Sequence, residues 1–150
     1  MHNIFRFKYL LVQNNIEEMN VRQFEIPLQN KPGELSNICN ILADAGINIE
    51  AVATELKDEN FGMVKIITND AQRTRKILKT AGIDYSEYEI VTVRLDDRPG
   101  ELAKLSTIFA KSEINIESLY VLDKHDGKTV LAIKVNNIAA AKNILEKNAI

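Results

Sequence analysis

The chain has 150 residues, 19 basic and 21 acidic side chains, and a formal net charge of -2. This near balance, with both signs interspersed, gives no electrostatic reason to expect nucleic acid or an anionic membrane as a partner. The one cysteine, Cys39, excludes an internal disulfide and suits a reducing cytoplasm.

The first segment, residues 1–18, alternates apolar Phe5, Phe7 and Tyr9 with basic Arg6 and Lys8, as a half-buried strand does. Two interpretations stay open: a poorly ordered extension before a start at Met19, or a segment that adds a strand. Its internal charges and the lack of a small-residue cleavage site argue against a secretory signal. No apolar run approaches the roughly 20 residues of a membrane span, and we expect a cytoplasmic protein.

The residue pattern from 24 to 81 predicts elements in the order strand, helix, strand, strand, helix. Pro27 within the first strand favours a sheet edge or a strand end. Pro32 stands where helix starts tolerate proline, Gly46 and Gly82 stand where helices end, and Asn69 is placed to cap the second helix. The predicted ranges are 24–29, 35–45, 47–55, 61–68 and 71–81.

A short fourth strand over 83–86 would then lead almost directly into a second set of the same elements. An Asp126-Gly127 hairpin turn joins two of its strands, and Asn136 or Asn137 is expected to cap its last helix. The second set ends at Ile150, one strand short, and residues 5–12, a neighbouring chain or nothing could fill that edge. Its predicted ranges are 89–95, 102–109, 114–122, 129–135 and 138–145.

The two sets are a sequence repeat. Residues 32–83 align without a gap to residues 99–150, and sixteen of the fifty-two aligned pairs are identical. The identities cluster in Pro-Gly-Glu-Leu at 32–35 and 99–102, and in Ile-Asn-Ile-Glu at 47–50 and 114–117. An internal duplication of this kind predicts tandem modules, which we place at residues 19–86 and 87–150 after an N-terminal extension of 1–18.

The order of elements predicts for each module an α+β fold of the ferredoxin-like βαββαβ type, which is an antiparallel sheet with helices on one face. The second module would lack its last strand. That fold hosts many functions, so the site has to be argued separately.

The repeated Asn/Asp-x-Pro-Gly turn, followed by Asn-Ile, resembles the ACT domains that sense small molecules in amino-acid metabolism. The resemblance covers residues 19–150 and is strongest to stand-alone proteins of two ACT domains. It implies domains that pair side by side and bind an amino acid where the first loop of one meets the second strand of its neighbour. The ligand-binding residues that it implies are Asn30, Pro32, Gly33, Glu34, Leu35, Asn48, Ile49, Asp97, Pro99, Gly100, Asn115, Ile116 and Tyr120.

An amino acid zwitterion carries a carboxylate and an ammonium close together, so its receptor needs neighbouring donors and acceptors. A helix start offers free backbone N–H groups and positive dipole, glycine allows close approach, and an asparagine amide offers one donor and one acceptor. The alternative is purely structural, because Pro-Gly starts helices in any protein and Asn or Asp often bonds to turns.

The two predicted sites differ in three places. Asp97 replaces Asn30 and would attract an ammonium but repel a carboxylate. Glu113 replaces Gly46, which puts the local backbone in question. Tyr120 replaces Ala53 and could cover a ligand side chain or could simply pack.

Other kinds of site have little support. His2 and His125 are isolated, so we expect no metal site, and no cofactor motif is present. Cys39 has no evident base partner, and no constellation of His, Ser and carboxylate supports catalysis. An RNA-binding module of this fold needs exposed aromatics on its middle strands, where only Phe24 is found.

The sequence therefore predicts a non-catalytic, amino-acid-binding regulatory protein of amino-acid metabolism that forms a homodimer through sheet edges. A regulatory subunit that docks on a metabolic enzyme and has vestigial ligand sites is the alternative. An RNA-binding module is a remote one.

Overall fold

A computed structural model describes residues 21–148 and residue 150. The segment 1–18, with its predicted strand, lies outside the described residues. The elements are β1 (Val21–Gln29), α2 (Glu34–Asp44), β2 (Ile49–Leu56), β3 (Phe61–Thr68), α3 (Ala71–Thr80), β4 (Ser86–Asp96), α4 (Glu101–Lys111), β5 (Ile116–His125), β6 (Lys128–Val135) and α5 (Ile138–Asn148).

The strands form one six-stranded sheet in the order β2-β3-β1-β4-β6-β5, and all neighbouring pairs are antiparallel. We call β1 to α3 the first half and β4 to α5 the second half. The α+β class and the repeated element order predicted from the sequence are confirmed.

Strand β4 corrects one prediction. The sequence suggested a strand over 83–86 and a separate one over 89–95, but β4 runs unbroken from Ser86 to Asp96. Its first part, Ser86 to Ile90, pairs with β1, and its second part, Val91 to Asp96, pairs with β6. One strand therefore serves both halves, because nothing between Ser86 and Asp96 interrupts the extended backbone.

The pairing of β1 with β4 has an internal symmetry. Arg22 faces Glu89 in the register, and these two residues are 67 positions apart, the offset of the sequence repeat. A residue that pairs with its own repeat equivalent marks a pseudo-twofold axis. Within the described residues the second half ends without a last strand of its own. The neighbour of β4 on that side is β1, which is none of the three possibilities that the sequence left open.

Each half packs its helices against its own strands. The first core lies between α2, α3 and the outer face of β1 and β3, and the second between α4, α5 and the outer face of β4 and β6. The alternation of apolar side chains along each strand produces this one-sided burial. The fully enclosed side chains include Phe24, Ile26, Leu42, Ile66 and Leu78 in the first core and Leu105, Phe109 and Ile133 in the second.

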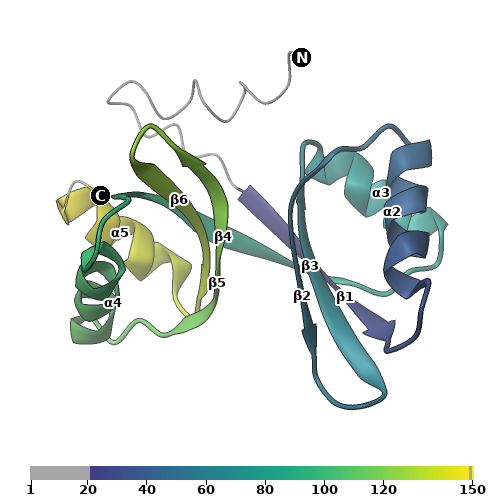
Figure 1. Cartoon of the computed structure of the whole chain (residues 1–150), viewed down its shortest axis with the longest axis horizontal. Coiled ribbons are helices and arrows are strands. Elements are labelled where there is room, and N and C mark those ends of the chain that lie inside the picture. The colour runs from purple at the N-terminus through teal and green to yellow at the C-terminus, as the bar shows by residue number, and fades with distance from the viewer. Residues whose placement is uncertain (1–20, 149) are drawn as a thin grey trace.

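The sheet also buries part of its inner face, the face without helices. Figure 1 shows α2 and α3 at one end of the molecule and α4 and α5 at the other, with all strands between them. The sheet curls between the halves, and edge strands β2 and β5 come into contact. A third apolar cluster fills this inner face, formed by Val21, Ile67, Ile90 and Ala132 with Ala51, Tyr120 and Leu122 packed against it.

Polar side chains join the halves beside this cluster. The Tyr120 hydroxyl donates a hydrogen bond to Gln23 Oε1 at 2.7 Å, and Gln23 is fully buried. Lys134 Nζ lies 3.0 Å from a Glu25 carboxylate oxygen and 3.3 Å from the centre of the Tyr88 ring. These contacts join residues far apart in the sequence.

Helix boundaries agree with most of the predictions. The cap of α3 is Asp70, whose side chain accepts from Arg73 N, and not Asn69 as predicted. For α5 the Asn137 side chain accepts from Ala140 N at 3.0 Å. Asn69 was misassigned because its carboxamide is used across the sheet, as described below.

The ends of α2 and α4 share one backbone shape. Gly46 has φ of 67°, and Glu113, its repeat equivalent, has φ of 55°. The bonds Ile47 N to Leu42 O and Ile114 N to Phe109 O are both 2.9 Å long. Glu113 thus takes the left-handed conformation that favours glycine, which answers the question that its substitution for glycine raised.

We expect Glu113→Gly to raise the free energy of unfolding by about 1 kcal/mol, because glycine enters the left-handed region without a Cβ penalty. The measurement is the midpoint of urea unfolding. Glu113→Ala, which removes the charge but keeps the Cβ, is the control and should give no comparable gain. Equal gains in both variants would show that the Glu113 carboxylate, and not the backbone conformation, destabilises the wild type.

We expect Tyr120→Phe to lower the free energy of unfolding by about 1–2 kcal/mol, because it leaves the buried Gln23 oxygen without its donor. Tyr85→Phe, between α3 and β4, is the control, since residues 21–148 and 150 give the Tyr85 hydroxyl no hydrogen bond.

The free energy of unfolding should also depend on pH in a way that differs between the wild type and Tyr120→Phe. Burial, and then the charge of Glu25, raise the pKa of Tyr120 above its ordinary value. The folded state therefore favours the neutral phenol, and this stability is present below about pH 10 and is lost at higher pH. Unfolding measured at rising alkaline pH should show a shallower loss for Tyr120→Phe than for the wild type.

Candidate functional site

The two predicted loop residues occupy equivalent places at the ends of β1 and β4. Asn30 N donates to Asn60 O and Asp97 N donates to Gly127 O, both at 2.8 Å. Each loop is thus held by backbone bonding to the hairpin that faces it. The repeat therefore produces the same local geometry twice.

The side chains of the loop residues are used within the chain. Asn30 Nδ2 donates to Glu59 O at 3.0 Å. The Asp97 carboxylate accepts from Lys124 Nζ at 2.9 and 3.0 Å and from Thr129 Oγ1 at 3.2 Å. The hydrogen bond from Lys124 lowers the pKa of Asp97 below its usual value, so this group is a carboxylate at neutral pH.

Gly33 and Gly100 are the N-caps of α2 and α4, with φ of 95° and 93°. A Cβ at either position would meet no atom of the chain within 4 Å. The backbone conformation, and not crowding within the chain, therefore requires glycine here. The space next to each glycine is open.

The starts of α2 and α4 have no side-chain cap. Their first N–H groups are among those that a helix leaves without internal partners. Pro32 and Pro99 precede the glycines and are exposed, and Leu35 and Leu102 in the first turns are 40% and 45% exposed. The first of these amides is used by the loop, since Glu34 N donates to Lys31 O at 3.4 Å and Glu101 N donates to Arg98 O at 3.5 Å. Each helix start thus combines the next backbone amides, which have no side-chain cap, with an exposed apolar side chain.

The acidic residues at the helix starts differ in their surroundings. Glu101 accepts hydrogen bonds from Lys104 Nζ at 2.9 Å and Arg98 Nε at 2.8 Å, which lower its pKa. Glu34 is its repeat equivalent and is half-buried. The two predicted sites are therefore unequal in charge environment.

Asn48 and Asn115 lie at the starts of β2 and β5 with exposed side chains. Their backbones are held by a second pair of asparagines, because Asn69 Oδ1 accepts from Asn48 N at 3.0 Å and Asn136 Oδ1 accepts from Asn115 N at 2.8 Å. Sequence reasoning missed this role for Asn69 and Asn136. The sequence does contain a signal for this role, because equivalent positions of the repeat both carry asparagine.

Ile49 and Ile116, the neighbours in the predicted motif, are half-buried and pack against the first and second cores. Their side chains support the fold. They do not reach the loop residues within the described chain, because they stand at the opposite end of the sheet.

Within one half, the loop asparagine and the strand asparagine do not come together. Asn30 bonds to Asn60 at the start of β3, and Asn48 bonds to Asn69 just after the end of β3. A strand rises about 3.3 Å per residue, so the two ends of β3 are on the order of 25–30 Å apart. Asp97 and Asn115 are separated in the same way by β6.

The structure places Tyr120 between the halves. Its hydroxyl bonds to Gln23 and its ring packs against the inner-face cluster. This contact is the packing alternative that the sequence left open beside a role in ligand binding.

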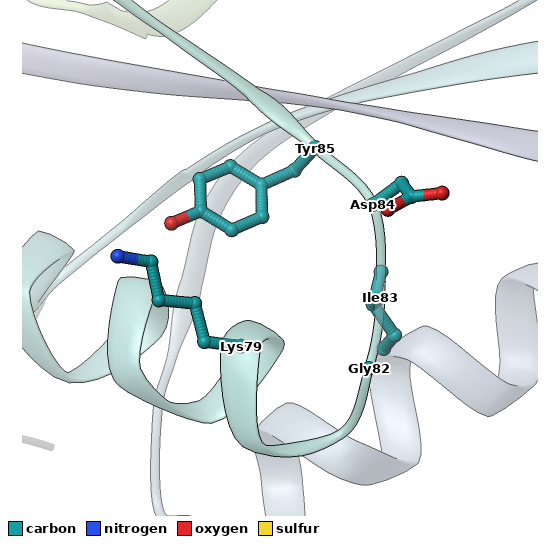
Figure 2. A pocket seen from close by; sticks show the side chains of 5 residues that line it. All are labelled: Lys79, Gly82, Ile83, Asp84 and Tyr85. Atoms are coloured by element: carbon teal, nitrogen blue, oxygen red, sulfur yellow. The ribbon is translucent and has the colours of Figure 1, made fainter.

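A shallow hollow of about 460 Å³ lies at the end of α3. Figure 2 shows Lys79 and Tyr85 extending toward one another across it, while Asp84 points away. The residues around it include none of the predicted site residues. It offers few polar groups that converge on one point, so we do not regard it as the site.

Residues 21–148 and 150 contain no group of three or more His, Cys, Asp or Glu side chains that could hold a metal ion. Among the same residues no helix is long and apolar enough to cross a bilayer.

The fold and the repeated helix starts define a class: paired α+β units that present two equivalent turn-and-helix motifs on one chain. The profile of the ACT domain pair family matches residues 19–150. The chain belongs to this family, which confirms the resemblance seen in the sequence.

Several solved structures share the fold. Protein BT0572 from Bacteroides thetaiotaomicron superimposes with a TM-score of 0.79 at 24% identity, over 86% of this chain and 88% of that one. The regulatory subunit of aspartate kinase from Thermus thermophilus gives 0.63 at 17% identity, over 87% and 93%. The corresponding subunit from Thermus flavus gives 0.61 at 18% identity, over 85% and 92%. No curated protein matches the chain.

Proposed function

We propose that this protein is a non-catalytic sensor that binds an amino acid and regulates another protein of amino-acid metabolism in the cytoplasm. Membership of the ACT domain pair family supports a regulatory, ligand-binding role. The observation that carries the proposal is the twofold occurrence of an uncapped helix start behind a left-handed glycine.

The chemistry of the helix start suits one end of a zwitterion. The free N–H groups of α2 and the positive end of its dipole attract a carboxylate. Gly33 leaves open space beside them, and Leu35 offers exposed apolar surface for a ligand side chain. The carboxamide of Asn48 can serve both the ammonium and the carboxylate of the ligand.

A complete site of this kind needs a second copy of the chain. Asn30 and Asn48 of one chain are on the order of 25–30 Å apart, so they form one pocket only if Asn48 comes from a partner. A ligand bound between copies would favour one packing of the two chains over another, which is how binding becomes a signal.

The edge strand β2 is the surface that we propose for the homodimer. Val52 and Leu56 on this strand are 52% and 67% exposed. An exposed apolar edge strand has free backbone groups that pair readily with another strand. Asn48 immediately precedes this strand, so pairing there would bring the strand asparagine to a neighbouring chain.

The second candidate function is a regulatory subunit that docks on a metabolic enzyme and has vestigial ligand sites. The use of the Asn30 amide nitrogen and the Asp97 carboxylate within the chain favours it, because these atoms already have hydrogen-bond partners. A single enzyme recovered in stoichiometric amount, together with no thermal shift from any amino acid, would establish this alternative.

Thermal unfolding with each of the twenty amino acids tests the sensor proposal. At a hundred times its dissociation constant, a ligand adds about 2.7 kcal/mol of stability, which raises Tm by about 5–10 °C for a protein of this size. Asn48→Ala should weaken that ligand by about tenfold or more, because a hydrogen bond to a charged group is lost. Asn143→Ala, an exposed carboxamide on α5, is the control and should bind as the wild type does.

The dimer has its own test. Leu56→Glu places a charge on the proposed interface and should shift the molar mass measured by light scattering from dimer toward monomer. Val121→Glu is the matched control on the other edge strand, β5, where Val121 is 51% exposed. A dimer that survives Leu56→Glu but not Val121→Glu would place the interface on β5.

A further inference from the structure

A network of polar side chains joins the two halves on the inner face of the sheet. Gln23 Nε2 donates to Glu25 Oε1 at 2.9 Å, and Lys134 Nζ donates to the same oxygen at 3.0 Å. Glu25 lies on β1 and Lys134 on β6, so this ion pair crosses from the first half to the second. The Tyr120 hydroxyl extends the network by donating to Gln23. We call these side chains the inter-half network.

The network is shielded from water. The side chains of Glu25 and Lys134 are 12% and 14% exposed, and Gln23 is fully buried. The Tyr88 ring covers the ammonium group, whose Nζ lies 3.3 Å from the ring centre. Glu117 lies farther from this Nζ, at 3.7 Å, and is 40% exposed. Weak solvent screening strengthens the attraction between buried charges, but withdrawing both from water costs free energy of similar size. A gain in stability therefore does not account for an ion pair at this place.

The sequence repeat shows that the symmetric place is built differently. The equivalents of Gln23, Lys134, Tyr120 and Glu25 are Ile90, Ile67, Ala53 and Thr92. Ile67 and Ile90 belong to the apolar cluster of the inner face. The pseudo-twofold axis therefore relates the inter-half network to part of that cluster, and the contact between the halves is polar on one side of the axis and apolar on the other.

These two sides differ in how strictly they set position. Apolar contacts are non-directional, so the side chains of the apolar cluster gain from any arrangement that keeps them covered. Hydrogen bonds and ion pairs need their partners at particular distances and angles. A displacement of Lys134 would leave the Glu25 carboxylate buried without its counter-charge, at a large cost in free energy.

The orientation of the halves also sets where the two helix starts lie. Strand β1 leads from the inter-half network to the loop before α2, and β4 leads from its pairing with β1 to the loop before α4. A rotation of one half against the other would therefore change the distance between Gly33 and Gly100.

We propose that the inter-half network is an orientation lock, with the ion pair of Glu25 and Lys134 as its central contact. The lock selects one packing of the two halves. The pairing of β1 with β4 and the apolar cluster hold the halves together whether the lock is present or not. The inference concerns the chain without ligand and so does not depend on the sensor proposal.

The test removes both charges together in the full chain, so that neither is left buried alone. In the lock variant, Glu25→Gln keeps an oxygen that accepts from Gln23, and Lys134→Met keeps a long unbranched side chain. The matched control is Glu55→Gln with Lys65→Met. Lys65 is 12% exposed and its Nζ lies 3.3 Å from a Glu55 oxygen, but both residues belong to the first half.

Each protein is measured in two ways. The midpoint of urea unfolding reports stability, and residual dipolar couplings of the backbone amides report the orientation of each half. We expect a midpoint for the lock variant no lower than that of the wild type, because replacing both members of a buried ion pair is often neutral or stabilising. One alignment tensor should fit both halves of the wild type and of the control, whereas the halves of the lock variant should need different tensors.

Three results would overturn the proposal. A lower midpoint, or a lock variant that does not fold, would make the ion pair a contact that stabilises the fold. A single tensor for the lock variant, with the halves oriented as in the wild type, would show that the remaining contacts set the packing. Different tensors for the two halves of the control would show that losing any shielded ion pair of the inner face loosens the halves.

Discussion

The antiparallel pairing of β1 with β4 is the contact on which the whole architecture depends. It runs through the Arg22–Glu89 pair, where a residue meets its own repeat equivalent. Two duplicated units that pair in this way share one sheet, so neither has a free edge at the centre of the molecule. The second half needs no last strand of its own, because β1 occupies that side of β4.

The curl of this sheet produces two different kinds of surface. The outer faces are covered by helices and close two ordinary hydrophobic cores. The inner faces meet through a smaller apolar cluster and a set of polar contacts, of which Tyr120 with Gln23 is fully enclosed on the Gln23 side. Buried polar contacts demand particular partners, so they fix one arrangement of the halves more strictly than apolar packing alone would.

The repeated candidate site lies at the ends of these strands. The helix starts of α2 and α4 open outward at the ends of strands and are repeated, as expected of motifs that a duplication preserved.

The sequence by itself determined the repeat, the element order, the helix starts at Gly33 and Gly100 and the one-sided cores. These features depend on local signals: alternation along strands, helical spacing, and glycine where φ is positive. It also identified the asparagine motifs, but it gave Asn69 a local role as a helix cap when its carboxamide serves Asn48 across the sheet.

Only the tertiary structure decided which of these residues are neighbours. The separation of Asn30 from Asn48, the unbroken course of β4 and the contact of Tyr120 with Gln23 depend on strand register and on the curl of the sheet. Register is set by many weak pairings summed along two strands, and residues 97 positions apart carry no local signal of their contact. For that reason the sequence could name the groups of a binding site but could not place them around one ligand.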